Sequence, residues 1–192
     1  MNYEIKVQDK ISYIEEGTGE PLLLLHGLFG ALSNFEHLIE HFRHRNKVIV
    51  PILPLFDLDI FHTTVSGLEK IVHNFIEAKG YTGIHLLGNS LGGHVGLVHV
   101  LKHPEKIKSL TLTGSSGVFE KAMGDSYPKR GDYDYIKNKT EQTFYDPAVA
   151  TKELVDEVFE ITRNRIKVIK ILALAKSAIR SNLGPELSQI QQ

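Results

Sequence analysis

The sequence predicts an α/β fold, with a doubly wound and mostly parallel sheet that carries helices on both faces. The first observation behind this prediction is a set of apolar segments, broken only lightly, at residues 21–25, 47–50, 84–87 and 107–112. Strands of a parallel sheet are covered on both faces, so they show such runs instead of alternation. The second observation is that helical patterns lie between the runs, and alternation of strand and helix is typical of a parallel sheet.

Two N-terminal segments have a different pattern. Residues 3–7 and 11–15 alternate apolar and polar side chains, and Gln8-Asp9-Lys10 between them fits a short turn. This pattern predicts an antiparallel hairpin at the edge of the sheet. The helical patterns that follow cover residues 35–42, 68–79 and 91–101. Gly80, directly after the second of these, is typical of a residue that ends a helix.

The composition changes after Gly114. Residues 115–131 are rich in Gly, Ser and charged side chains, and residues 133–180 are helical in pattern without a strand-like run. We therefore expect three parts in the chain. These are a sheet core over residues 1–114, an all-helical insertion over residues 115–183, and the start of a return to the core over residues 184–192.

Within the insertion, residues 163–180 carry six basic and no acidic side chains. Apolar side chains fall on one side of this helix, at Ile166, Ile169, Leu172 and Ala173. A basic amphipathic helix can lie on a membrane or a partner, but packing of its apolar stripe on its own domain is commoner. We expect the second arrangement.

Composition excludes several classes of function. The 192 residues suffice for one domain with a hydrophobic core, and the absence of Cys excludes disulfides and thiolate metal sites. A formal net charge of -1 argues against a nucleic-acid partner. No apolar run approaches the ~20 residues that span a bilayer, and no basic leader opens the chain, so a cytoplasmic protein is expected. No group of metal ligands is apparent, and neither a metal nor another cofactor is expected.

A Gly-x-Ser-x-Gly motif lies between a predicted buried strand and a predicted helix, at residues 88–92. Such a strand–turn–helix context is what a nucleophile elbow requires. Gly88 and Gly92 leave room for a tight turn, and Ser90 is placed at the helix N-terminus, where free N–H groups favour negative charge. A Gly-rich turn of this kind can also be purely structural, but the context favours a nucleophile.

A second turn follows the strand at residues 21–25 and reads His26-Gly27-Leu28-Phe29. Acyl transfer places negative charge on a carbonyl oxygen, which needs two donors fixed in advance. The backbone amides of Leu28 and Leu91 are the candidates for these donors. His26 is expected to anchor its loop by hydrogen bonds and not to act as a base. Neither turn has the glycine spacing that phosphate binding requires, so nucleotide binding is not expected.

Together the two motifs resemble the α/β-hydrolase superfamily, in particular its esterase-like members with a helical cap. The resemblance covers essentially the whole chain and implies that Ser90 is the nucleophile and that residues 115–183 cap the active site. It also implies that the amides of Leu28 and Leu91 form the oxyanion hole. Positions that shape the binding loops would be His26, Gly27, Phe29 and Asn89. Epoxide hydrolases and haloalkane dehalogenases of this fold carry Asp as nucleophile, so a serine disfavours those chemistries.

The chain departs from the family pattern in two places. Residues 51–58 stand where many relatives have a Gly-rich loop near the nucleophile. The triad acid and histidine of this fold follow later strands, but all ten histidines lie between His26 and His103, and no strand-like run follows the cap. We therefore expect neither the triad histidine nor its acid within these residues. The simplest expectation is the N-terminal part of a longer hydrolase, inactive by itself and without the last strands of the sheet.

Two functions from different classes follow from these observations. The leading hypothesis is a carboxylesterase-like serine hydrolase that cleaves a carboxylic ester or related small acyl substrate through an acyl-enzyme. The alternative is a non-catalytic protein that uses the same fold to bind a small ligand. The open sheet edge after the sixth predicted strand makes self-association, or completion by another polypeptide, a further possibility.

Overall fold

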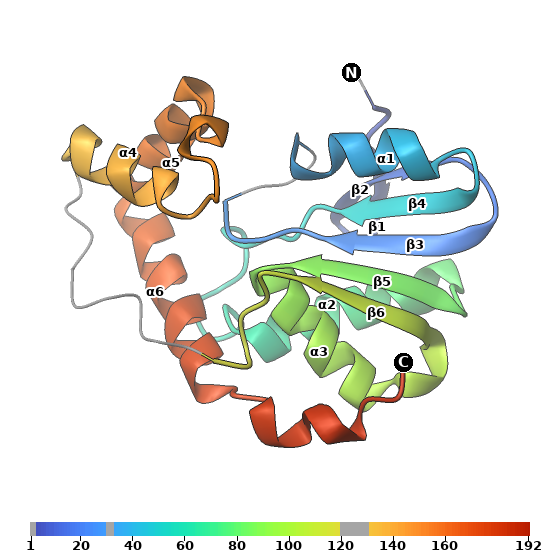
Figure 1. Ribbon diagram of the computed structural model, residues 1–192. Coiled ribbons are helices and arrows are strands. Elements are labelled where there is room, and N and C mark those ends of the chain that lie inside the picture. Colours follow the sequence, from blue (N-terminus) through green and yellow to red (C-terminus); the bar gives the residue numbers. More distant parts are fainter. Residues whose placement is uncertain (1–2, 30–32, 120–130) are drawn as a thin grey trace.

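The computed structural model describes residues 3–29, 33–119 and 131–192. Within these ranges a six-stranded sheet, in the order β1-β2-β4-β3-β5-β6, forms the centre of the molecule, and helices cover both of its faces (Figure 1). The strands are β1 (Lys6–Gln8), β2 (Ile11–Glu16), β3 (Glu20–Leu25), β4 (Asn46–Pro51), β5 (Ile84–Asn89) and β6 (Ile107–Thr113). The α-helices are α1 (Glu36–Phe42), α2 (Val65–Lys79), α3 (Leu91–Lys102), α4 (Tyr133–Glu141), α5 (Lys152–Arg163) and α6 (Arg165–Arg180). Short 3-10 helices are η1 (Ser33–Phe35), η2 (Pro104–Lys106), η3 (Pro147–Val149) and η4 (Gly184–Gln189).

The sheet has the predicted mixed character. Strand β1 pairs antiparallel with β2, and β2 pairs antiparallel with β4. Strands β4, β3, β5 and β6 then run parallel to one another. The hairpin turn is formed by Asp9 and Lys10, whose φ angles are 48° and 70°; two successive residues in this region twist the chain as the flanking strands require. The predicted α/β fold, parallel core and N-terminal hairpin are therefore confirmed.

Two hydrophobic clusters lie on the two faces of the sheet. Successive strand residues point to opposite faces, so Leu22 and Leu24 of β3 pack in one cluster, and Leu23 and Leu25 pack in the other. Helix α1 covers the first face through Ile39. Helices α2 and α3 cover the second face. Because all four leucines are buried, β3 shows a continuous apolar run in the sequence.

Helix α2 begins three residues before the predicted start. Its N-cap is Thr64, whose side-chain oxygen accepts a hydrogen bond from the amide of Gly67 at 3.0 Å. A Thr cap of this kind stabilises the first turn, which is why the helix extends beyond its apolar pattern. The helix ends at Gly80 with φ of 64°, as the sequence predicted.

The C-terminal region is helical, as expected, but the buried side of α6 differs from the predicted one. Ile166 and Ile169, which were predicted to pack, are 66% and 55% exposed. The buried residues of α6 are Val168, Ile171, Leu174 and Ala178. The rotation of α6 is set by its neighbours, because the helix contacts both α5 and α2. In Figure 1, α6 runs from α4 and α5 back to the sheet core.

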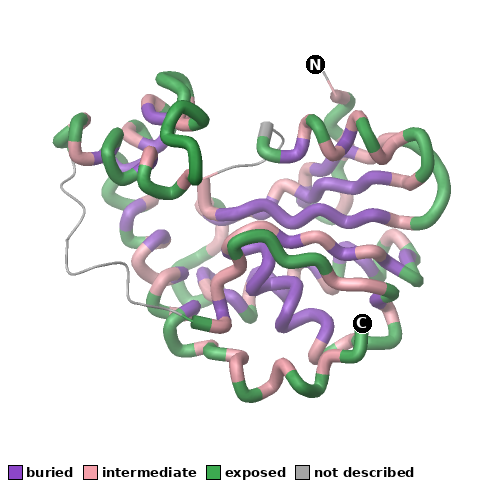
Figure 2. The backbone as a smooth tube through the Cα atoms, viewed as in Figure 1, coloured by how far each residue is buried: buried purple, intermediate pink, exposed green. Residues whose placement is uncertain are grey.

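The second half of α6 is part of the core. Leu174 and Ala178 belong to the same hydrophobic cluster as α2 and α3. The amide of Val65 donates to Oγ of Ser177 at 3.0 Å. Figure 2 shows that burial is concentrated in the central strands and α3, whereas β6 is largely exposed at its end of the sheet. In the described ranges, no helix has the length and apolarity that crossing a membrane requires.

Candidate active site

Ser90 occupies a sharp turn between β5 and α3. Its φ and ψ are 51° and -118°, and it serves as the N-cap residue of α3 without a capping bond from its side chain. For a residue other than glycine, this backbone conformation costs on the order of 1–3 kcal/mol. Such strain persists only where the surrounding structure enforces it. Among the described residues other than glycine, only Asp9 and Lys10 of the hairpin turn also have a positive φ.

Glycines around Ser90 enforce the turn by allowing backbone to pack on backbone. A Cβ on Gly88 would lie 2.5 Å from Cα of Gly93. A Cβ on Gly92 would lie 2.1 Å from the carbonyl oxygen of Leu25, at the end of β3. These separations are shorter than any contact that carbon makes with such atoms, so neither position accepts a side chain. Both glycines of the motif are therefore required by tertiary packing as well as by the turn.

Hydrogen bonds from the neighbouring strand hold the turn in place. The amide of Ser90 donates to the carbonyl oxygen of Thr113 at 3.0 Å, and the amide of Ser116 donates to the carbonyl oxygen of Ser90 at 3.2 Å. The side-chain amide of Asn89 donates to the oxygen and to Oγ1 of Thr113, both at 3.1 Å. Asn89 thus lies toward β6 and fastens the elbow to it.

The turn after β3 lies directly against Ser90. A Cβ on Gly27 would be 3.2 Å from Cβ of Ser90 and 3.2 Å from Oδ1 of Asn89. The structure therefore brings together two motifs that lie 63 residues apart in the sequence, counted from Gly27 to Ser90. Close approach here depends on the missing side chain of Gly27.

The backbone amides of Leu28 and Leu91 follow Gly27 and Ser90 directly. Leu91 is buried and Leu28 is partly buried, and both pack on the larger hydrophobic cluster. Within the described part of the chain, neither amide donates a hydrogen bond to another group. The first amides of a helix have no partner inside the helix, and they bind negative charge favourably. Phe29, next to Leu28, is partly buried.

His26 is an anchor of this loop by its geometry. Its ring is 3% exposed; Nδ1 donates to the carbonyl oxygen of Gly27 at 2.7 Å, and Nε2 accepts from the amide of Leu53 at 2.8 Å. This pattern requires a neutral ring with its proton on Nδ1. Burial lowers the pKa of His26, against a smaller opposite effect of the bond to Gly27. Both ring nitrogens are engaged, so neither can take a proton from Ser90.

The loop of residues 51–58 is held from two sides. Besides the bond between Leu53 and His26, the ammonium of Lys170 on α6 donates to the carbonyl oxygen of Phe56 at 2.6 Å. Leu53 and Leu55 are both buried in the core. This loop therefore links the His26 turn to α6, although its sequence lacks the glycines that the resemblance led us to expect.

Two further histidines, His94 and His62, make contacts with groups other than Ser90. His94 on α3 is fully buried and donates from Nε2 to the carbonyl oxygen of Ser181 at 2.8 Å. An acid–histidine pair that was not predicted joins Asp59 and His62 at 2.6 Å, where the bond from His62 lowers the pKa of Asp59. This pair is exposed and, in the described ranges, makes no hydrogen bond to Ser90. No triad acid or base is thus identified in the described residues.

A group of potential metal ligands, which the sequence did not reveal, lies within the described residues. The structure brings together Glu69, His73, His99 and His103 between α2 and α3, at the opposite end of α3 from Ser90. Sequence inspection missed the group because its members come from two helices about 30 residues apart. The signal that could have found it is the four-residue spacing within each pair, which places both side chains on one helix face.

Comparisons with known proteins match both the fold and the site region. The family model described as alpha/beta hydrolase fold matches residues 20–148. An alpha/beta hydrolase enzyme from the metagenome of lagoon sediments of Mar Chica, Morocco, is 36% identical, with a TM-score of 0.78, and the match covers 98% of this chain and 72% of that chain.

The chain is also similar in sequence to a lipase and to a dienoate hydrolase. Lipase 1 of Psychrobacter immobilis is 30% identical over 125 residues, which is 62% of this chain and 39% of the lipase. The 2-hydroxy-6-oxo-6-phenylhexa-2,4-dienoate hydrolase of Comamonas testosteroni is 28% identical over 94% of this chain and 71% of its own length. The match to the lipase thus spans about two fifths of that relative.

Proposed function

The chain belongs to the α/β-hydrolase family, and from this premise we propose that it carries the nucleophile and oxyanion hole of a serine hydrolase. The substrate would be a carboxylic ester or a related acyl compound. The observation that carries this proposal is the strained backbone of Ser90, held by Gly88 and Gly92 beside the Gly27 turn. A structural turn gains nothing from a strained serine, whereas a nucleophile gains an exposed hydroxyl at a helix N-terminus.

In the proposed reaction, Oγ of Ser90 attacks the carbonyl carbon of the substrate. The carbonyl oxygen becomes negative in the tetrahedral intermediate, and the amides of Leu28 and Leu91 donate hydrogen bonds to it. Their lack of partners among the described residues supports this role. The intermediate then expels the alcohol, leaving an ester between Ser90 and the acyl group, which water hydrolyses in a second step.

The proton of Ser90 needs a base, and we propose that this base and its acid partner are supplied from outside the 192 residues. The proposal rests on the contacts of the two histidines nearest the motifs in sequence. Both ring nitrogens of His26 are engaged, and Nε2 of His94 is bound to Ser181. In serine proteases, the oxyanion hole and substrate binding alone retain ~10³–10⁴ over the uncatalysed rate. We therefore expect the isolated chain to hydrolyse esters only weakly.

The cap is proposed as the part that selects the substrate. Helices α4 and α5 lie beside the sheet core, and α6 connects them to it (Figure 1). The division into a core of residues 1–114, a cap of residues 115–183 and a returning segment of residues 184–192 is part of this proposal. The relatives named lipase and dienoate hydrolase both carry names of hydrolytic enzymes, which supports an acyl or other carbonyl substrate.

A fluorophosphonate probe tests the proposal directly, because it forms a covalent bond with an activated serine. We expect labelling at Ser90 in the protein with its proposed base present, measured by peptide mass spectrometry, and none at that position in Ser90→Ala. Ser116→Ala is the matched control, since Ser116 lies beside the elbow and its side chain has no proposed role in the reaction. Its labelling should equal that of wild type.

Two results would contradict parts of the proposal. Failure of the probe to label Ser90, together with a thermal shift on adding a small ligand, would favour the non-catalytic binding protein. Rapid hydrolysis of p-nitrophenyl acetate by the 192-residue chain, lost in Ser90→Ala, would show that the base lies within these residues.

A further inference from the structure

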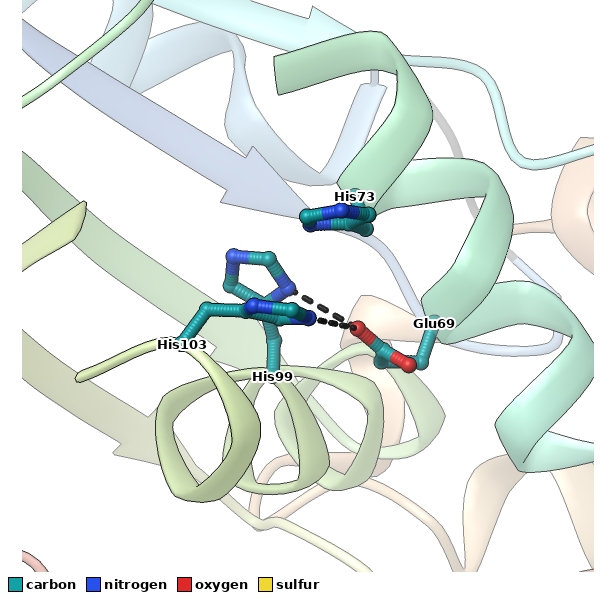
Figure 3. Close-up of side chains that lie close together, drawn as sticks. All are labelled: Glu69, His73, His99 and His103. Carbon is teal, nitrogen blue, oxygen red and sulfur yellow. Dashed lines mark hydrogen bonds and ion pairs between the residues drawn. The ribbon is translucent and has the colours of Figure 1, made fainter. Parts of the chain in front are cut away.

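Four polar side chains meet between α2 and α3, away from the proposed active site (Figure 3). Glu69 and His73 lie one turn apart on α2, and His99 and His103 lie one turn apart at the end of α3. One potential ligand atom from each side chain lies within 4.8 Å of the others. Two facing helices, each with a pair at this spacing, thus direct a carboxylate and three imidazoles to one place.

Two distances from Glu69 are close to the separation between the ligand atoms of a metal ion. Oε1 of Glu69 is 3.0 Å from Nδ1 of His99 and 3.7 Å from Nε2 of His103. With Zn–N and Zn–O bonds of about 2.0–2.1 Å, the ligand atoms of a tetrahedral zinc site are about 3.3 Å apart. The two measured separations lie on either side of this value, so an ion fits between these atoms after small side-chain shifts.

Burial adds a second, independent observation. Glu69 is 2% exposed and His99 is fully buried. Nδ1 of His73 and Nε2 of His99 are buried without a hydrogen-bond partner in the described part of the chain. Buried polar atoms are nearly always satisfied, and each orphaned one costs about 1–3 kcal/mol. The unpartnered Nδ1 of His73 therefore indicates a missing ligand in this group, whereas an ion bound to Nδ1 of His99 leaves Nε2 of that ring unbonded.

The charges of the group favour a cation. Neutral imidazole and ionised carboxylate are the forms that bind metals. The ammonium of Lys102 holds Oε2 of Glu69 at 2.6 Å, which leaves Oε1 directed at the histidines.

We propose that Glu69, His99 and His103 bind a divalent transition-metal ion, with His73 as the fourth ligand. Three nitrogen donors and one carboxylate oxygen suit Zn²⁺ among the common ions, whereas Mg²⁺ and Ca²⁺ prefer oxygen. The His73 ring is stacked on His103, with centroids 3.9 Å apart and planes at 12°. An imidazole binds a metal in its own plane, so His73 turns out of this stack when it coordinates the ion.

The site has a structural role in this proposal. Along α3, with a rise of about 1.5 Å per residue, His99 is about 14 Å from Ser90. The ion therefore does not touch the reacting atoms. It ties α2 to α3, the helix that carries Ser90 at its first turn, and should raise the resistance of this helix pair to unfolding.

Titration of metal-free protein with Co²⁺ and Zn²⁺ tests the site. Wild-type protein should bind one equivalent of Co²⁺ with the strong visible absorption of a tetrahedral complex, and Zn²⁺ should displace it. His103→Ala and Glu69→Gln should weaken binding at least about tenfold. His73→Ala should weaken it less, because His73 must first leave its stack on His103 to reach the ion. Zn²⁺ should raise the melting temperature of wild type but not of His103→Ala.

The matched control is His37→Ala/His41→Ala, which removes an exposed pair with the same spacing on α1. This variant should bind like wild type. Absence of a tetrahedral Co²⁺ spectrum in wild type, or loss of binding in the α1 variant alone, would overturn the proposal. His103 is partly exposed, so His103→Ala should fold and can test the metal site even where Glu69→Gln fails to fold. Retention of wild-type metal affinity in folded His103→Ala would also overturn the proposal.

Discussion

His94, one turn beyond Ser90 on α3, donates a hydrogen bond from Nε2 to the carbonyl oxygen of Ser181, 87 residues further along the chain. The same ring faces Gly117, where a Cβ would lie 2.5 Å from Cδ2 of the histidine. His94 therefore contacts both Gly117 and Ser181, which lie on either side of helices α4, α5 and α6, from the helix that begins after Ser90. The contacts of this histidine near the proposed nucleophile thus indicate a structural role and not proton transfer.

Replacing His94 by alanine should loosen this connection. His94→Ala leaves the oxygen of Ser181 without its donor and opens a cavity in the core, so we expect a loss of about 2–4 kcal/mol in the free energy of unfolding. Hydrogen exchange should accelerate most at residues 177–183. The exposed His62 provides the control, and His62→Ala should leave both measurements close to wild type. Equal exchange in the two variants would contradict the role of His94.

Strain at Ser90 predicts an unusual order of stability. Glycine adopts positive φ without a steric penalty, whereas alanine keeps the strain of serine. The free energy of unfolding of Ser90→Gly should therefore exceed that of Ser90→Ala by about 1 kcal/mol, even though glycine is normally the less favourable residue. Ser90→Gly should accordingly unfold at a higher urea concentration. Urea denaturation of the two variants measures the difference. A lower stability of Ser90→Gly would show that the backbone at this position is not strained.

Two glycines of α3 should differ strongly in how much stability their replacement by alanine costs. Gly92→Ala places Cβ 2.1 Å from a backbone oxygen of β3, which cannot move without displacing the strand. This substitution should cost more than about 4 kcal/mol or prevent folding. Gly96→Ala places Cβ 2.7 Å from Cδ2 of Leu86, a side chain that can turn. Because alanine also favours the helix by about 1 kcal/mol, we expect a change smaller than 1–2 kcal/mol in thermal or urea unfolding.

The buried His26 should make stability depend on pH. Its pKa in the folded protein is lowered by burial, whereas in the unfolded chain it is about 6.5. As pH falls through about 6.5, the unfolded state therefore binds a proton that the folded state does not, and stability decreases until the folded pKa is reached. Its contribution is fully present above this window.

His26→Asn tests this linkage. The variant should be less stable than wild type at pH 8, because the amide of Leu53 loses its acceptor, but it should lose less stability between pH 7 and 5. The exposed His44 is the control, since His44→Asn removes a histidine outside the core. Urea denaturation across this pH range gives both slopes, and an unchanged slope in His26→Asn would contradict the prediction.

Self-association through the sheet edge remains a prediction. In the described ranges β6 pairs only with β5, and Leu112 on it is 37% exposed. Edge strands invite pairing, and a lysine on the edge opposes it. Leu112→Lys should therefore lower the dimer fraction measured by light scattering, whereas Val7→Lys on the short opposite edge strand β1 should not. A monomeric wild-type protein would remove the basis of this prediction.

Local features of the structure were predictable because their causes are local. The hairpin turn at Asp9 and Lys10, the stop at Gly80 and the elbow at Ser90 each follow from a few neighbouring residues and their backbone preferences. The continuous apolar runs predicted parallel strands for a similar reason, since a strand that is buried on both faces is apolar at nearly every residue.

By itself, then, the sequence determined the order of strands and helices and the two turns proposed for catalysis. The tertiary structure decided which distant residues meet: Gly27 with Ser90, His26 with Leu53, and the Glu69 group between α2 and α3. It also decided which side of α6 is buried, where the predicted stripe at Ile166 and Ile169 was wrong. The physical reason is that periodicity records how a segment is covered, whereas the partner that covers it depends on the packing of the whole chain.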